Sequence, residues 1–144
     1  MIDRESRAFE TEDVDLMLSV YHPDMVWAWP PHSRAYDPME WIMRMGRFEH
    51  DRWARMLQLF FDTHELIHNH RTTRKIVMSE EGDGAFAVVD IDTLHRRRGD
   101  TDSPWHDGNP ELHTVGRACK IYTLTGDGWK MLYQPGTMHY PVGT

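Results

Sequence analysis

The stretch Asp13–Pro30 (DVDLMLSVYHPDMVWAWP) decides the fold, together with Gly116–Gln134 (GRACKIYTLTGDGWKMLYQ) near the other end of the chain. The first stretch begins with apolar residues at the i, i+3, i+4, i+7 spacing of an amphipathic helix, and it turns through His22-Pro23-Asp24 into an aromatic strand. The second stretch predicts a β-hairpin, because Asp127-Gly128 is a favoured turn between two strand-like runs. We interpret the two stretches as two halves of one pocket.

The remaining segments predict helices first and strands afterwards. Thr11 is a plausible cap of the first helix, Pro23 ends it, and Asp37-Pro38-Met39-Glu40 has the pattern of a second helix start. Helices followed by an antiparallel meander predict an α+β fold rather than alternating βαβ units. The expected elements are a helix from Val14, a strand over Met25–Trp29, helices from Asp37 and over Trp53–Asp62, and strands over Glu65–Met78, Ala85–His95, His113–Leu124 and Trp129–Met138.

Length, charge and composition limit the classes of protein that this chain can represent. Its 144 residues with 40% apolar content predict one domain over 1–144. The net charge of −7 opposes binding to phosphate backbones, so we expect no nucleic-acid partner. No apolar run is long enough to cross a membrane and the first residues are charged, so we expect a cytoplasmic protein without membrane contact. The single Cys119 lies in an apolar strand and predicts a buried thiol.

The chain is rich in residues that suit a lined cavity. It contains ten histidines, six tryptophans and ten methionines. Tryptophan and methionine provide large, adaptable apolar walls, and histidine exchanges a proton or binds a metal near neutral pH. Most single histidines lie at surfaces and strand ends, so only clustering on one face of the sheet would indicate a site.

The two end segments resemble the nuclear transport factor two-like superfamily. The resemblance rests on the helix that turns into a strand near Tyr21 and on the pattern Cys119-Lys120-Ile121-Tyr122 followed by Gly128-Trp129-Lys130-Met131. It is greatest to the SnoaL-like branch, and it covers most of the chain, roughly from Asp13 to Met138. The resemblance implies a cone in which a curved antiparallel sheet, mixed at one edge, wraps around N-terminal helices and encloses a pocket. It also implies a homodimer formed through the other face of the sheet.

The catalytic groups of the ketosteroid isomerases in this superfamily are absent. The position of their general base is Trp29, the position of their second acid is Lys120, and their tyrosine would fall near Glu5. The resemblance therefore argues against steroid isomerisation by that apparatus. Lys120 aligns instead with an arginine that receives carboxylates or other anions in several members.

Strand parity suggests what could replace that chemistry, because residues two apart share one face of a strand. His68 and His70 share one face, and Asp90 and Asp92 share another. A histidine–aspartate pair inside the cone would provide a general base, whereas alternating histidines with His95 or an aspartate would provide metal ligands. The alternative without chemistry is that these groups form ion pairs with nearby arginines on a solvated surface.

We interpret the chain as a domain that binds a small, partly apolar molecule, aromatic or polyketide-like and anionic. The enzymatic version is a lyase or isomerase that uses histidine and aspartate as acid and base, and the alternative is a non-catalytic ligand-binding or oligomerisation module. We expect no cofactor, and we assign no metal because spacing alone fixes no third ligand. The candidate catalytic residues are His70, Asp90 and Lys120, and the candidate ligand-binding residues are Tyr21, Trp29, Trp53, His68, Asp92 and Tyr122.

Overall fold

A computed structural model describes residues 1–27, 34–37, 39, 46–99 and 109–141 of the chain. Within these residues the helices lie in the N-terminal part of the chain, interrupted by two strands, and the long strands follow, which agrees with the α+β expectation. None of the described helices is long and apolar enough to span a membrane. In chain order the elements are α1 Ile2–Glu10, α2 Val14–Ser19, β1 Tyr21–Trp27, β2 Gly46–Arg47, α4 His50–Thr63, β3 His64–Met78, β4 Gly84–Arg97, β5 Glu111–Thr125, β6 Gly128–Tyr133 and β7 Gly136–His139.

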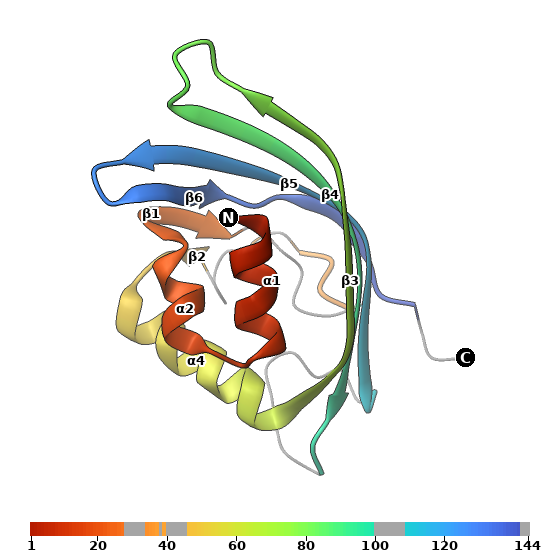
Figure 1. The fold of residues 1–144 in the computed structure, drawn as a ribbon. Helices are drawn as coiled ribbons and strands as arrows, with labels where there is room; N and C mark the ends of the chain where they lie inside the picture. Colours follow the sequence, from red (N-terminus) through yellow and green to blue (C-terminus); the bar gives the residue numbers. More distant parts are fainter. Residues whose placement is uncertain (28–33, 38, 40–45, 100–108, 142–144) are drawn as a thin grey trace.

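The strands form one open, curved sheet that bends around α1, α2 and α4 (Figure 1). The strand order is β2-β1-β6-β5-β4-β3. The short strand β7 pairs with Val115–Ala118 of β5. Neighbouring strands are antiparallel except for β1 and β6, which are parallel and make the sheet mixed at this side. The expectation of a cone with a mixed edge is therefore confirmed.

β4 lies between β3 and β5, and its alternating residues point to the two faces of the sheet. Its odd-numbered residues from Ala87 to His95 are buried against the helices, and its even-numbered residues face the other way. The pairing of β4 with β5 continues without a shift from Gly84↔Thr123 to Arg96↔Glu111, so each face extends across both strands. We call the helix-covered face concave and the opposite face convex.

The core lies between the concave face and the helices. Trp53 of α4 is fully buried, and its ring lies 5.3 Å from that of Tyr21 and 5.2 Å from that of Phe48, both edge to face. Rings in this geometry attract beyond the effect of area alone. The predicted helical spacing in this segment thus packs α4 onto β1 through an aromatic cluster.

The start of the chain differs from the expectation. Residues Ile2–Glu10 form a helix that the sequence did not predict, because their charged side chains mask a narrow buried stripe containing Glu5 and Ala8. The next helix is capped by Asp13, whose side chain accepts a hydrogen bond from the backbone N–H of Leu16, and not by Thr11.

The first strand also begins earlier than expected. β1 starts at Tyr21, so the predicted helix ends before this residue and Pro23 lies inside the strand rather than at its boundary. The pairing of β1 with β6 shifts between Tyr21 and Val26, which accommodates a residue without a backbone N–H. The predicted strand end at Trp29 and the predicted helix from Asp37 to Met45 fall largely outside the described residues.

Candidate functional site

A group of buried charges occupies the concave face beneath α1. The ammonium of Lys120 on β5 forms an ion pair with the carboxylate of Glu5 on α1, and both side chains are almost completely buried, with 0% and 2% exposed. Nη1 of Arg71 on β3 lies 3.8 Å from Oε1 of Glu5. We call Glu5, Arg71 and Lys120 the charge cluster; it contains two cations for one carboxylate.

The pKa shifts within the charge cluster follow from burial and from the partners. Burial lowers the pKa of Lys120 to about 8, although the carboxylate of Glu5 opposes this effect. Burial alone would raise the pKa of Glu5, but the charges of Lys120 and Arg71 outweigh it and lower the pKa. Glu5 therefore remains ionised at neutral pH, and its charge stabilises the two buried cations.

Arg71 is held in place by its neighbours on the same face. Its Nε donates to Oδ1 of Asn69 at 2.9 Å, and its guanidinium lies over the ring of Phe9, 5.6 Å from the centroid. Among the described residues Nη1 of Arg71 is buried without a hydrogen-bond partner. A fixed, buried donor of this kind is suited to an acceptor on a ligand.

A pocket of about 400 Å³, the concave pocket, opens next to the charge cluster between the start of α1 and the sheet. The hydroxyl of Tyr122 is buried without a hydrogen-bond partner in the described part of the chain, and burial, followed by the charge of Glu5, raises its pKa. Tyr122 therefore keeps its proton and can donate it in a hydrogen bond. The pocket is lined by Met1, Ile2, Asp3, Thr73, Ile76, Met78, Ala85, Ala87, Tyr122 and Trp129.

Of the predicted site residues, four lie on the concave side. Lys120 belongs to the charge cluster and Tyr122 lines the concave pocket. Tyr21 and Trp53 are also buried there, but they pack against each other in the aromatic cluster and do not line this pocket. Trp29 lies outside the described residues.

The other four predicted residues lie on the convex face, so the single pocket expected for His70, Asp90 and Lys120 does not form. Asp90 is opposite Arg117, three residues before Lys120, and residues three apart on a strand point to opposite faces. His70 is directly opposite Asp92, on the same side as Asp90. Sequence parity could not decide which set faced the helices, and each residue's catalytic role stays a prediction.

Asp90 and Asp92 have different partners on the convex face. Asp90 accepts hydrogen bonds from Nε of Arg74 at 2.5 Å and from Nε of Arg117 at 2.7 Å, and these contacts lower its pKa to about 2. Asp92 contacts His68 and His113 instead, and these hydrogen bonds lower its pKa. Asp90 thus has the ion-pair role of the non-catalytic alternative, whereas Asp92 lies in a histidine cluster.

Three residues of these sites were not assigned from the sequence. Glu5 could have been found from the spacing of Ile2, Glu5 and Phe9, which places a carboxylate on an apolar helical stripe. Arg71 was considered only as a surface ion-pair partner. His113 gave no local signal, because its proximity to Asp92 depends on how β5 pairs with β4.

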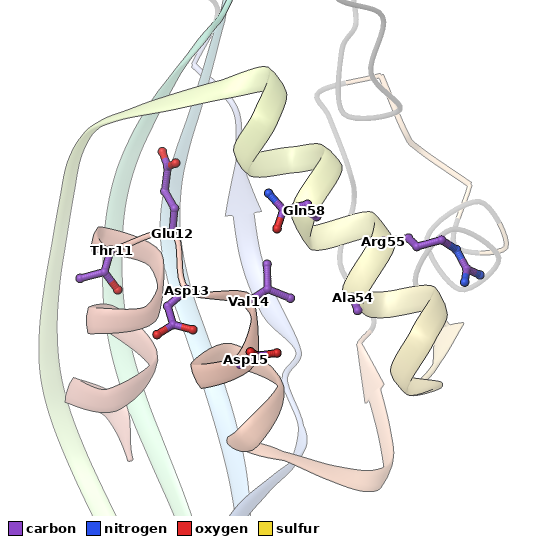
Figure 2. Close-up of a pocket in the computed structure, with 8 residues that line it drawn as sticks. All are labelled: Thr11, Glu12, Asp13, Val14, Asp15, Ala54, Arg55 and Gln58. Carbon is purple, nitrogen blue, oxygen red and sulfur yellow. The ribbon is translucent and has the colours of Figure 1, made fainter.

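A second pocket, of about 610 Å³, lies between the α1–α2 turn and α4 (Figure 2). Two of its three acidic side chains have structural roles: Asp13 caps α2, and Glu12 accepts a hydrogen bond from Nη2 of Arg98 at 2.9 Å. Figure 2 shows Arg55 extending away from the turn. The groove therefore shows no convergent set of functional groups, and the concave pocket remains the better candidate.

Comparisons with known proteins identify the fold. No protein-family model matches the sequence, and neither does any curated protein. A ketosteroid isomerase-like protein from Erwinia carotovora atroseptica is 12% identical, with a TM-score of 0.64, and the match covers 99% of this chain and 92% of that chain. A nuclear transport factor two-like protein of unknown function in nutrient uptake from Rhodospirillum rubrum is 14% identical, with a TM-score of 0.62 and coverage of 97% and 94%.

A third similar structure, from Exiguobacterium sibiricum, is named as a candidate calcium/calmodulin-dependent kinase II association domain. It is 10% identical, with a TM-score of 0.61, and the match covers 98% of this chain and 89% of that chain. With these likenesses, the open curved sheet and the helices on its concave face define the nuclear transport factor two-like fold. The chain has this fold over its described length.

Proposed function

We propose that this chain binds a small, partly apolar anion in the concave pocket. The observation that carries the proposal is that two buried donors have no hydrogen-bond partner among the described residues: the Tyr122 hydroxyl, and Nη1 of Arg71, which has the longer ion pair with Glu5. Leaving such donors unpaired is costly, and an acceptor on a ligand would remove that cost. The charge cluster adds a net positive charge beside them, because two cations, Arg71 and Lys120, share the single carboxylate of Glu5 within it.

The residues of the pocket divide into two functional groups. Apolar side chains such as Ile76, Met78 and Trp129 would cover the apolar part of the ligand and exclude water. Tyr122 would donate a hydrogen bond to the anionic group of the ligand, and Arg71 would orient that group. Lys120 lies behind them, two residues from Tyr122 on the same face of β5, and it would contribute charge rather than direct contact.

In the enzymatic version of the proposal, the domain is a lyase or isomerase. Of the three residues predicted as catalytic, only Lys120 lies on the concave side, and because Lys120 and Glu5 do not line the pocket, a proton would pass between them and the ligand through Tyr122. The pKa of Lys120, lowered to about 8 by burial, suits proton exchange near neutral pH. The ketosteroid isomerase-like neighbour supports this class of reaction only by its fold.

The rival proposal is a binding or oligomerisation module without catalysis. The neighbour named as a candidate association domain supports it, and so do the apolar side chains exposed on the convex face. Val77, Phe86 and Ile121 are cross-strand partners on β3, β4 and β5, with 44%, 38% and 37% of each residue exposed. The expected homodimer through this face stays a prediction that analytical ultracentrifugation can check.

A ligand titration tests the proposal. We expect cinnamate, a small aromatic carboxylate, to bind with saturation in isothermal titration calorimetry and its neutral methyl ester to bind more weakly. Tyr122→Phe removes one charge-assisted hydrogen bond, worth about 1.5–3 kcal/mol, so affinity should fall about tenfold or more. Arg71→Gln should weaken binding in the same way.

Arg74→Gln is the matched control, because Arg74 lies three residues further along β3 and its side chain contacts Asp90 on the convex face. This variant should bind cinnamate as the unmodified protein does. Equal binding of acid and ester, or unchanged affinity in both Tyr122→Phe and Arg71→Gln, would contradict the proposal.

A further inference from the structure

The convex face carries a second group of functional side chains, the histidine cluster of His68, Asp92 and His113. Nε2 of His68 lies 2.7 Å from Oδ1 of Asp92, and Nε2 of His113 lies 2.8 Å from the same oxygen. One ligand atom from each residue lies within 4.8 Å of both others. Because these residues are on the opposite face of the sheet from the charge cluster, they form a site independent of the concave pocket.

The sheet itself brings the three side chains together. Leu94 on β4 lies opposite His68 on β3 and opposite His113 on β5, so the two histidines flank the same position of β4. Asp92 is two residues away on the same face, and diagonal neighbours at this spacing are within reach of long side chains. Nε2 of both rings contacts Oδ1 of Asp92, one ring coming from β3 and the other from β5. The convergence is therefore fixed by three adjacent strands rather than by a loop.

We propose that His68, Asp92 and His113 bind a divalent transition-metal ion, with Zn²⁺ as the favoured ion. Two imidazole nitrogens and one carboxylate oxygen are common protein ligands of zinc, with bonds of about 2.0–2.2 Å. Ligand atoms around a tetrahedral zinc ion are then about 3.4 Å apart, so the two hydrogen-bonded contacts need to open by less than about 1 Å. A fourth position would be open to water.

The surroundings leave Asp92 available for this role. The neighbouring arginines of the convex face, Arg74 and Arg117, both contact Asp90. His70 stacks on His68 with ring centroids 4.6 Å apart and an angle of 16° between the rings, which restrains the plane of the His68 imidazole. The side chains of the cluster are 28% (His68), 46% (Asp92) and 31% (His113) exposed, so an ion can reach them from solvent.

The competing interpretation is a hydrogen-bonded group without a metal, in which each histidine donates an N–H to Asp92. His68→Gln and His113→Gln separate the two interpretations, since a glutamine amide can still donate a hydrogen bond but is a poor zinc ligand. His50→Gln is the matched control, because Nδ1 of His50 also contacts a carboxylate, that of Asp51, at 3.1 Å on another part of the surface.

The experiment is a titration of the full chain with ZnCl₂ after dialysis against a chelator, followed by calorimetry and thermal unfolding. We expect saturable binding of one ion per chain, a rise in Tm, and an affinity reduced by about 100-fold or more in each of His68→Gln and His113→Gln. The His50→Gln variant should bind as the unmodified protein does.

A visible absorption band of bound Co²⁺, lost in both cluster variants, provides a second readout that a purely structural role of the histidines would not affect. The proposal is overturned if the chain shows no stoichiometric Zn²⁺ binding. It is also overturned if His68→Gln and His113→Gln leave the affinity unchanged, which would place the ion elsewhere on this histidine-rich chain.

Discussion

The two faces of the sheet use similar ionisable residues with different physical consequences. On the concave face Glu5 and Lys120 are almost completely withdrawn from water, whereas on the convex face Asp90 and its arginine partners are partly exposed. Water and salt screen the exposed pairs, but nothing comparable compensates a buried charge whose partner is lost. We therefore expect burial, more than residue type, to determine how much each of these charges contributes to stability.

The largest expected effect comes from removing one partner of the buried pair. Lys120→Met leaves the carboxylate of Glu5 buried with the more distant Arg71 as its remaining ion-pair partner among the described residues, and breaking such a pair costs about 3–5 kcal/mol in the free energy of unfolding. Urea unfolding followed by circular dichroism measures this loss. Lys75→Met, at an exposed position of β3, should have little effect.

The double variant Glu5→Gln with Lys120→Met should recover only part of the loss, because it leaves no unpaired buried carboxylate but also removes the partner of Arg71. If Lys120→Met lowered the free energy of unfolding no more than Lys75→Met does, the concave charges would have to be accessible to water. The contrast between the two faces would then be wrong.

An intermediate effect is expected from pH through His95, a buried residue of the concave face. Burial lowers the pKa of His95 from 6.5 to about 3, so between these pH values the imidazole binds a proton in the unfolded chain but not in the folded chain. The contribution of the neutral His95 to the stability of the fold is complete above about pH 6.5 and is lost as the pH falls toward 3. By linkage His95 alone should lower the free energy of unfolding by about 2 kcal/mol between pH 7 and pH 5.

Urea unfolding at both pH values, compared with that of His95→Leu, isolates this contribution, since the variant should lose that part of the pH dependence. His50→Leu, at an exposed histidine, should retain it. If His95→Leu and the unmodified chain had the same pH dependence, the imidazole would have to be accessible to water despite its position next to Phe60, 4.7 Å away between ring centroids.

The smallest effect is expected on the convex face. Asp90→Asn removes the carboxylate that contacts Arg74 and Arg117, and added salt should erase the small fall in Tm that follows. The hydrogen bonds from the two arginines lower the pKa of Asp90 from 3.8 to about 2, so its contribution is present above about pH 4 and disappears as the pH falls through 2. Thermal unfolding at low and high salt measures the fall in Tm and its dependence on salt. A loss as large as that of Lys120→Met would refute the proposed difference between the faces.

Much of the fold could be predicted because its signals are local. The spacing of apolar residues around Trp53 gave a helix, and Asp127-Gly128 gave the last hairpin, where Gly128 has a φ of +99° that favours glycine. The helix Ile2–Glu10 was missed since its buried stripe is short and its other residues are charged. Pro23 was predicted to end the helix but lies inside β1, because a strand with shifted pairing tolerates a proline.

Less of the candidate site could be predicted. Parity correctly placed His68 with His70 and Asp90 with Asp92, and the resemblance indicated Lys120 as a residue of the site. Parity states only which residues share a face, and it does not state which face the helices will cover. Lys120 was therefore combined with His70 and Asp90, which the structure places on the opposite side of the sheet.

The sequence by itself determined the α+β class, the meander of long strands and the alternation of residues along each strand, because these depend on contacts between neighbours in the chain. Only the tertiary structure decided that Glu5 neutralises Lys120 and that His113 joins His68 at Asp92. The first pair lies 115 residues apart in the chain, and the second grouping depends on the register of three strands. Such contacts arise from packing and pairing across the whole sheet, and no local pattern encodes them.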